Sequence, residues 1–150
     1  MRAYRLAKAQ YAALDGEGAR LYGGRWNSVG VAMVYLSSSA ALAVLEYLVH
    51  LDPSMLPRDL VLLTVEIPDN IGLDRWDPLP SNWSQHPTPS ECHLMGDEWI
   101  RSARSAAVLV PSVIVPMENN ILLNPAHSDA RRIAIVETNP FPIDARFSRT

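Results

Sequence analysis

The strongest constraint on the fold is a series of short apolar runs that end at proline or at small polar residues. The clearest is Leu60–Ile67, which is rich in β-branched residues and is closed by Pro68. Val31–Leu36 is apolar on both faces, and Val108–Val115 is interrupted by Pro111-Ser112. Runs of this length and composition predict β-strands, and proline keeps a strand from continuing inside a sheet. The chain is therefore expected to be built mainly on strands.

Shorter patterns complete the prediction. Further strands are expected at Ile121–Leu123 and Ile133–Thr138, with an edge strand at Met1–Leu6 and strand potential in Phe141–Phe147. Met117–Asn120 is expected to form the turn before Ile121. Strands outnumber helices and do not alternate strictly with them, which favours the α+β class.

Two longer helices are predicted. The first covers Ala40–Leu51, begins after three serines that can cap it, and stops at Asp52-Pro53. The second runs from about Glu91 to Ser105 with Ser90 as its cap, and its core-facing residues are expected to be Leu94, Trp99 and Ile100. Ala9–Leu14 has room for one or two helical turns.

Length and composition limit the class of protein. The chain has 150 residues, enough for one domain over 1–150, and 48% apolar with 19% charged residues is typical of a folded protein. The net charge of −3 provides no overall basic field for nucleic acid. A single cysteine, Cys92, excludes an internal disulfide. No apolar run is long enough to span a bilayer, and the residues after Met1 lack the apolar core of a signal peptide, so we expect a cytoplasmic protein.

The stretch from Leu21 to His50 carries the residues best suited to chemistry. A Gly-Gly turn is followed by Arg25, whose planar guanidinium suits a phosphate or a carboxylate. In the following helix, Glu46 lies four residues after Leu42 and three before Val49, which places it on the apolar side. A carboxylate there needs polar partners. The pattern fits a small-molecule site, and it equally fits a boundary glutamate that reaches water or joins a structural ion pair.

Several other chemistries lack their motifs. The sequence has no phosphate-binding Gly-x-x-x-x-Gly-Lys loop, no Gly-x-Gly-x-x-Gly after a strand and no Gly-x-Ser-x-Gly turn. The four histidines are scattered without metal-ligand spacing, so no metal is expected. Residues Pro68–Pro89 are expected to form a long surface loop held down by Trp76 and Trp83, and loops of this length are often functional.

Several short motifs occur together and in a fixed order. They are Tyr4-Arg5-Leu6, Gly23-Gly24-Arg25-Trp26-Asn27, Tyr35-Leu36-Ser37 with Ala43 and Glu46, Gly96-Asp97-Glu98-Trp99, Val110-Pro111-Ser112, and the run from Glu118 to Pro125. Spread from residue 4 to residue 125, this set resembles the RES-domain toxins, which are named for an arginine, a glutamate and a serine.

The resemblance implies a fold, an activity and a partner. RES toxins are similar in fold to ADP-ribosyltransferases, with a split antiparallel sheet around an NAD cleft and flanking helices. They act on NAD, either by splitting it with phosphate or water or by moving ADP-ribose onto a protein. They are usually paired with an Xre-type helix-turn-helix antitoxin that covers the active site. From the charge balance and the lack of a long apolar run, the chain is expected to bind neither nucleic acid nor a membrane directly.

The resemblance also assigns residues. The family's arginine, tyrosine, glutamate and serine fall on Arg25, Tyr35, Glu46 and Ser112, and an earlier arginine falls on Arg5. The expected catalytic set is Glu46, Arg25, Tyr35 and Ser112, and the expected NAD-binding set is Arg5, Arg25, Trp26, Asn27, Tyr35 and Ser112.

These residue types suit the chemistry. Guanidinium groups can clamp a pyrophosphate, and a carboxylate can stabilise the positive charge that develops on the ribose. Tyr35 could stack on the nicotinamide, and Ser112 could hydrogen-bond the nicotinamide or the ribose. Each also has an ordinary structural interpretation: Tyr35 as core, Ser112 as a turn hydroxyl and Arg5 as part of a surface ion pair.

The leading hypothesis is therefore a toxin that consumes NAD and arrests growth. A protein ADP-ribosyltransferase is the closest alternative, and the sequence does not choose between phosphorolysis, hydrolysis and transfer to a protein. A non-catalytic module that binds a nucleotide or a partner is an alternative of another class. A nuclease toxin is disfavoured by the acidic charge balance and by the lack of a metal cluster.

Overall fold

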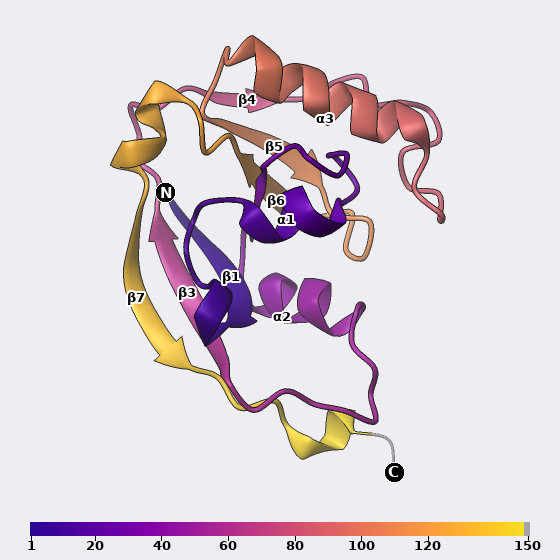
Figure 1. The fold of residues 1–150 in the computed structure, drawn as a ribbon, viewed down its shortest axis with the longest axis vertical. Helices are drawn as coiled ribbons and strands as arrows, with labels where there is room; N and C mark the ends of the chain where they lie inside the picture. The colour runs from indigo at the N-terminus through magenta and orange to yellow at the C-terminus, as the bar shows by residue number, and fades with distance from the viewer. Residues whose placement is uncertain (149–150) are drawn as a thin grey trace.

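The computed structural model describes residues 1–148, and within them seven strands form one sheet. In chain order the strands are β1 (Arg2–Lys8), β2 (Val34–Ser37), β3 (Leu60–Glu66), β4 (Leu73–Arg75), β5 (Ala107–Pro111), β6 (Asn119–Leu123) and β7 (Ala134–Pro140). Across the sheet the order is β4-β5-β6-β2-β1-β3-β7 (Figure 1). Every neighbouring pair is antiparallel except β4 and β5, which are parallel. The α+β class is confirmed.

The sheet is split between its two halves. Strands β1 and β2 are joined at one residue pair, Tyr4 with Ser37. By contrast, β2 pairs with β6 at four positions and β1 pairs with β3 at seven. The halves β4-β5-β6-β2 and β1-β3-β7 are therefore linked by a narrow seam, as the expected split sheet requires.

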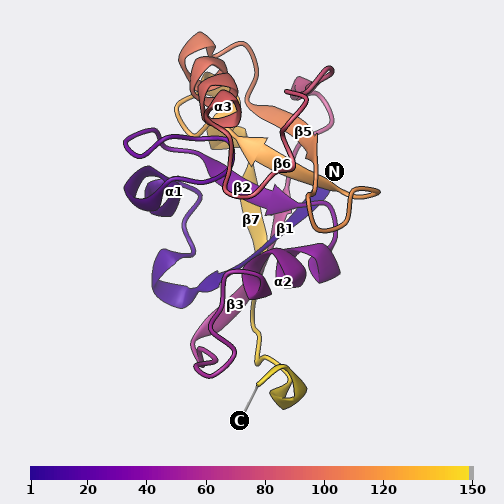
Figure 2. The same cartoon turned by 90° about the vertical axis from the view of Figure 1, so that its right-hand side faces the viewer.

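Three α-helices and three short 3-10 helices complete the fold. They are α1 (Glu17–Tyr22), α2 (Ala40–Leu48), α3 (Ser90–Ser102), η1 (Ala9–Tyr11), η2 (Ser128–Arg132) and η3 (Ala145–Phe147). Helix α2 packs mainly against β1, and α3 lies at the opposite end of the molecule from η3 (Figures 1 and 2). None of these helices, within residues 1–148, has the length and apolar character needed to cross a membrane.

The core has two parts on opposite faces of the sheet. Val34 and Leu36 belong to one cluster, while Tyr35 between them packs against the other. This alternation follows from strand geometry, in which successive side chains point to opposite faces. The second cluster is built around the tryptophans Trp26, Trp76 and Trp99.

Helix α2 is capped by a serine at its start, as predicted. Ser39 is the N-cap, and its side chain accepts a hydrogen bond from the backbone N–H of Leu42 at 3.1 Å. The prediction for α3 is wrong in this respect, because Pro89 is the N-cap and Ser90 makes no capping bond.

Several expected boundaries differ. The first strand is not an edge strand but lies between β2 and β3, and β2 begins at Val34 instead of Val31. The expected Met117–Asn120 turn is shorter, because Asn119 and Asn120 already pair with β5. The segment 141–147 contains no strand and ends in η3. The loop 68–89 includes β4, which pairs with β5.

One burial prediction is also wrong, because Leu94 on α3 is 63% exposed. The apolar side chains near Glu46 are exposed as well: Leu45 on α2 is 39% exposed, and Val49, the C-cap of α2, is 60% exposed. The spacing of apolar residues along a helix shows which side is apolar but not what packs on it, and in α2 only Leu42 and Ala43 are fully buried. The apolar side of α2 is thus open beyond its first turns.

Candidate functional site

Glu46 on α2 is half-buried and is held by two side chains from distant parts of the sequence. Its Oε1 accepts a hydrogen bond from Ser112 Oγ at 2.8 Å and another from Asn120 Nδ2 at 2.7 Å. Ser112 follows β5 directly and Asn120 lies in β6. The helix and the β5–β6 hairpin therefore meet at this carboxylate, and the predicted pair of Glu46 and Ser112 is brought together.

Ser112 is fully buried, and both its backbone N–H and its side-chain oxygen have hydrogen-bond partners. Its Oγ accepts hydrogen bonds from the backbone N–H groups of Ile114 and Val115, both at 3.1 Å. A serine hydroxyl has one hydrogen to donate, and here it goes to Glu46. The turn after β5 thus fixes the direction in which Ser112 donates.

A second contact ties the hairpin to the start of α2. Ser39 Oγ donates to Glu118 Oε1 at 2.6 Å while it caps the helix. Helix α2 and the β5–β6 connection are therefore fixed to each other at two points, through Ser39 at the start of the helix and through Glu46 near its end.

The Gly-Gly turn presents Arg25 at the surface of the tryptophan cluster. Arg25 Nη1 donates to the backbone carbonyls of Trp83 and Gln85, at 2.8 and 2.9 Å. Among residues 1–148, no hydrogen bond reaches its Nε or Nη2. These N–H groups are available to a ligand, whereas Nη1 is used to fasten the loop between β4 and α3.

Trp26 lies beneath this turn. It is 2% exposed, stacks on Trp83 with ring centroids 6.5 Å apart, and meets Trp76 edge-on at 5.1 Å. Trp76 is itself 5% exposed. The prediction that tryptophans hold down the long loop is confirmed.

Asn27 and Tyr35 form a buried polar pair. Tyr35 Oη donates to Asn27 Oδ1 at 2.6 Å and accepts from the Trp26 N–H at 3.0 Å. The Asn27 amide nitrogen donates to three backbone carbonyls, one in α1 and two in the loop that follows. Burial raises the pKa of the Tyr35 hydroxyl above its ordinary value, so this group stays protonated. Both side chains shape the turn that carries Arg25, and their direct contact with NAD stays a prediction.

Helix α3 anchors the same turn from the other side. Asp97 accepts from the N–H of Ser28 at 2.9 Å and from its hydroxyl at 2.6 Å. Gly96 lets the helix approach closely, because a Cβ there would lie 1.5 Å from the Trp26 carbonyl oxygen. Helix α3 therefore positions the Arg25 turn in two ways: the Asp97 carboxylate binds Ser28, and Gly96 lets the helix backbone pack closely on the turn.

The two groups of residues lie beside each other on one face of the sheet. Tyr35 pairs with Leu122, and Ser37 pairs with Asn120 on the same two strands. Tyr35 and Asn120 are thus diagonal neighbours across β2 and β6, a separation of about 7–8 Å between backbones. This register connects the Arg25 turn with the Glu46 carboxylate.

Arg5 is not joined to either group by a hydrogen bond in residues 1–148. Its Nη1 donates to the carbonyls of Tyr11 and Ala13, each at 3.1 Å. Burial lowers the pKa of Arg5 from its ordinary value, and the nearby Asp15 opposes this effect. The structure shows Arg5 holding the segment after β1, and its role in NAD binding stays a prediction.

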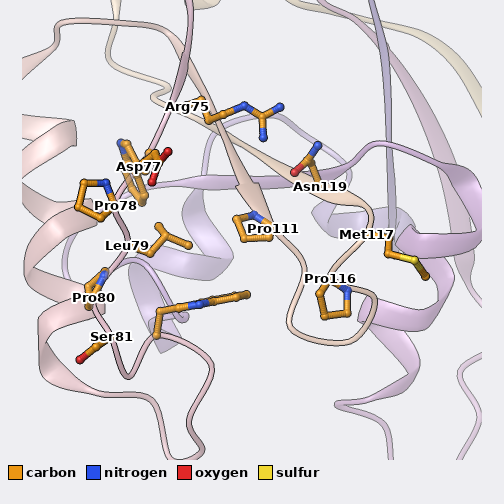
Figure 3. A pocket seen from close by; sticks show the side chains of 12 residues that line it. Arg75, Asp77, Pro78, Leu79, Pro80, Ser81, Pro111, Pro116, Met117 and Asn119 are labelled. Atoms are coloured by element: carbon orange, nitrogen blue, oxygen red, sulfur yellow. The ribbon is translucent and has the colours of Figure 1, made fainter.

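An open pocket of about 610 Å³ adjoins the site. Its walls are residues 75–81 with Trp83 on one side, and Pro111, Pro116, Met117 and Asn119 of the β5–β6 hairpin on the other (Figure 3). Pro111 and Asn119 directly precede Ser112 and Asn120, which both bind Glu46. Trp83 provides a carbonyl to Arg25. The pocket is therefore lined by chain neighbours of the candidate residues, whereas Arg25, Tyr35, Glu46, Ser112 and Asn120 are not among the residues that line it.

Two residues of this arrangement were not predicted to be functional. Asn120 was expected in a turn, and the strand register that directs its side chain to Glu46 depends on pairing with β2. Asp97 was one acid among several in a helix. Its position before the buried Trp99 and after a glycine is a signal for a buried carboxylate, but the partner lies 69 positions away in the chain.

The architecture is that of an α+β protein with a split, mostly antiparallel sheet and a carboxylate site beside the seam. A family model described as "RES domain" matches residues 2–144. The chain belongs to the RES-domain family, and the resemblance inferred from its motifs is confirmed.

The relatives are toxins. The chain is 45% identical over 148 residues to "Toxin Res" of Photorhabdus laumondii, covering 95% of this chain and 94% of the relative. It is 44% identical over 140 residues to "Prs ADP-ribosylating toxin" of Sphingobium sp., covering 91% of this chain and 87% of the relative.

A solved structure has the same fold. The crystal structure of the M. tuberculosis MbcT–MbcA toxin–antitoxin complex matches with a TM-score of 0.75 and 20% identity. The match covers 93% of this chain and 83% of that one. At this identity the comparison shows that the folds agree.

Proposed function

We propose that this chain is the toxin of a toxin–antitoxin pair, and that it acts in the cytoplasm by cleaving the nicotinamide–ribose bond of NAD. The observation that carries the proposal is the Glu46 carboxylate, held on one oxygen by Ser112 and Asn120 beside the turn that presents Arg25. Family membership supports the class of function, because the relatives named above are toxins.

In this reaction the electron pair of the C–N bond leaves with nicotinamide, whose ring nitrogen becomes neutral. Positive charge then develops on the ribose, as in other glycosyl transfers. A fixed carboxylate stabilises that charge without reorganising during the reaction. An oxygen of phosphate, water or a protein side chain then bonds to the same ribose carbon, and water or a protein hydroxyl loses its proton.

The residue roles follow from the contacts. Arg25 binds the pyrophosphate through the N–H groups that the described part of the chain leaves without a hydrogen bond. Trp26, Asn27 and Tyr35 hold the turn in place, because each is engaged with neighbouring residues. Arg5 is a second candidate for the phosphates. No metal is needed for these steps.

Two versions of the proposal differ in the group that accepts the ADP-ribose. Phosphorolysis or hydrolysis would deplete NAD, whereas transfer to a protein would modify a target. The printed name of the Sphingobium relative, an ADP-ribosylating toxin, favours keeping transfer as the second candidate.

The proposed partner is an antitoxin, of the Xre helix-turn-helix type, that covers this site. The surface around Glu46 supports such a contact. On α2, Leu45 and Val49 are 39% and 60% exposed, and in the β5–β6 loop Ile114 and Met117 are 37% and 91% exposed. Exposed apolar side chains of this size next to a polar site suit a protein partner.

The test is incubation of the purified protein with NAD, with and without phosphate, and measurement of nicotinamide. We expect release of nicotinamide. Dependence on phosphate would identify phosphorolysis, and label retained on protein would identify transfer. If neither nicotinamide nor labelled protein appears, the proposal is wrong.

Two variants test the residues. Glu46→Ala is expected to lower the rate about 100- to 1000-fold, because the charge on the ribose loses its stabilising partner. Arg25→Ala is expected to raise KM and to abolish toxicity. Matched controls are Glu98→Ala and Arg101→Ala, which remove an exposed ion pair on the outer side of α3 and should leave the rate unchanged. Growth arrest by Glu46→Ala at equal expression would contradict the role of the carboxylate.

A further inference from the structure

Asn120 occupies a special place at the beginning of β6. Its Nδ2 donates to Glu46 Oε1 at 2.7 Å, and its Oδ1 accepts from Ser37 Oγ at 3.1 Å. Ser37 is buried in β2, the strand paired with β6. The amide is therefore oriented from behind by a buried hydroxyl and points its N–H at the carboxylate.

Asparagine is well suited to this position. The site needs one group that accepts from Ser37 and another that donates to Glu46, and a side-chain amide has both. Aspartate has the same shape but no N–H to donate, and leucine has neither group. The chemistry of the position thus specifies an amide.

The hydrogen bonds to Glu46 are unequal between its two oxygens. Ser112 and Asn120 both donate to Oε1. In the part of the chain that the structure describes, no hydrogen bond reaches Oε2. A carboxylate held this way has a defined rotation, and its second oxygen is directed away from the two donors.

We infer that Asn120 is a positioning residue for the cleavage of NAD: together with Ser112 it fixes Glu46 through Oε1 and leaves Oε2 for the ribose. This inference rests on the proposed function. Asn120 acts through Glu46 and not on the substrate, so its loss affects the chemical step more than binding. A glutamate side chain has several rotatable bonds, and holding it in one geometry before the substrate arrives lowers the barrier to the reaction.

The first experiment compares Asn120→Ala with the wild type in NAD turnover. We expect kcat to fall about 10- to 100-fold, the range expected for loss of a hydrogen bond to a charged group, with KM for NAD changed less than threefold. The matched control is Asn139→Ala, an exposed asparagine on β7, which should keep both constants. A kcat within twofold of wild type in Asn120→Ala would overturn the inference.

The second experiment asks whether Asn120 acts through Glu46. In a Glu46→Ala background, Asn120→Ala should lower the residual rate less than twofold, because the group it orients is gone. A full additional loss in the double variant would show that Asn120 works in another way and would overturn the inference. Thermal unfolding of each variant identifies any loss that comes from unfolding.

A third measurement does not require turnover. The side-chain amide signals of Asn120 in an NMR spectrum should shift in the Glu46→Ala variant, since their hydrogen-bond acceptor is lost. If the wild type fails to cleave NAD, the proposed function fails, whereas this shift still reports on the contact. If the wild type cleaves NAD and the Asn120 signals do not respond to Glu46→Ala, only the inference fails.

Discussion

At the scale of single residues, the site is held in place by buried polar side chains, such as Asn27 and Ser112, whose hydrogen bonds are made within the protein. Asn27 is 0% exposed and Ser112 is 0% exposed, and both have partners at every polar atom of the side chain. A buried polar group without a partner costs about 1–3 kcal/mol. Such residues keep one side-chain conformation, because any other conformation would break several hydrogen bonds.

Tyr35 offers a test of this principle with a defined pH dependence. Tyr35→Phe should lower the free energy of unfolding by about 1–3 kcal/mol at pH 7, because the Trp26 N–H and Asn27 Oδ1 lose their partner. Burial raises the pKa of the folded-state hydroxyl above that of the unfolded chain. The folded state then keeps its proton when the unfolded state loses it, so stability falls as pH rises above about 10.

The measurement is chemical denaturation between pH 8 and pH 11. The stability difference between wild type and Tyr35→Phe should shrink toward the alkaline end, because only the wild type loses this contribution. Tyr22→Phe, at a residue that is 83% exposed, is the control and should change stability by less than about 0.5 kcal/mol. A difference that grows with pH would contradict the assignment.

At the scale of elements, helix α3 and the Arg25 turn form one unit. Asp97 binds both polar groups of Ser28, and Gly96 removes the side chain that would separate helix and turn. The turn has little regular structure of its own: its own backbone contact is a single bridge between Gly24 and Asn27. Its shape is therefore set by the helix that packs on it together with the Asn27–Tyr35 pair.

Gly96→Ala tests this dependence. The added Cβ would lie 1.5 Å from the Trp26 carbonyl oxygen and 2.6 Å from its carbon, which are backbone atoms that cannot rotate away. We expect a loss of about 1–3 kcal/mol in unfolding free energy and reduced NAD turnover, since the helix and the turn must move apart. Denaturant titration and the nicotinamide assay measure the two effects.

The matched control is Gly18→Ala in α1, where a Cβ would meet nothing within 4 Å. Alanine is favoured over glycine in helices by up to about 1 kcal/mol, so this variant should be as stable as the wild type or more so. Equal effects of the two substitutions would mean that glycine content, and not the contact with Trp26, decides stability.

At the scale of the whole molecule, the two halves of the sheet meet where the site lies. Tyr35, Ser112 and Asn120 come from the half that contains β2, β5 and β6, whereas α2 with Glu46 packs mainly against β1 of the other half. The direct strand pairing between the halves is limited to Tyr4 and Ser37. A ligand bound across this seam should therefore tie the halves together.

ADP-ribose, which contains the part of NAD that the proposal assigns to Arg25, should stabilise the folded protein. At about 100 times Kd the gain is about 2.7 kcal/mol, and for a chain of this length that corresponds to a rise in Tm of roughly 5–10 °C. A thermal shift assay measures it. Arg25→Ala should show little rise, and an equal rise in that variant would show that the ligand binds elsewhere.

The sequence by itself determined the strand-rich class, the capped helix that carries Glu46 and the set of motifs typical of the RES family. These depend on local signals: apolar runs, proline positions, a serine cap and short motifs. The tertiary structure decided which strands became neighbours, since pairing joins residues far apart in the chain. It placed β1 inside the sheet, exposed Leu94 and Val49, and directed Asn120 and Ser112 to one oxygen of Glu46. Strand register and helix packing are set by contacts between distant segments, and a local pattern contains no information about which segment its partner will be.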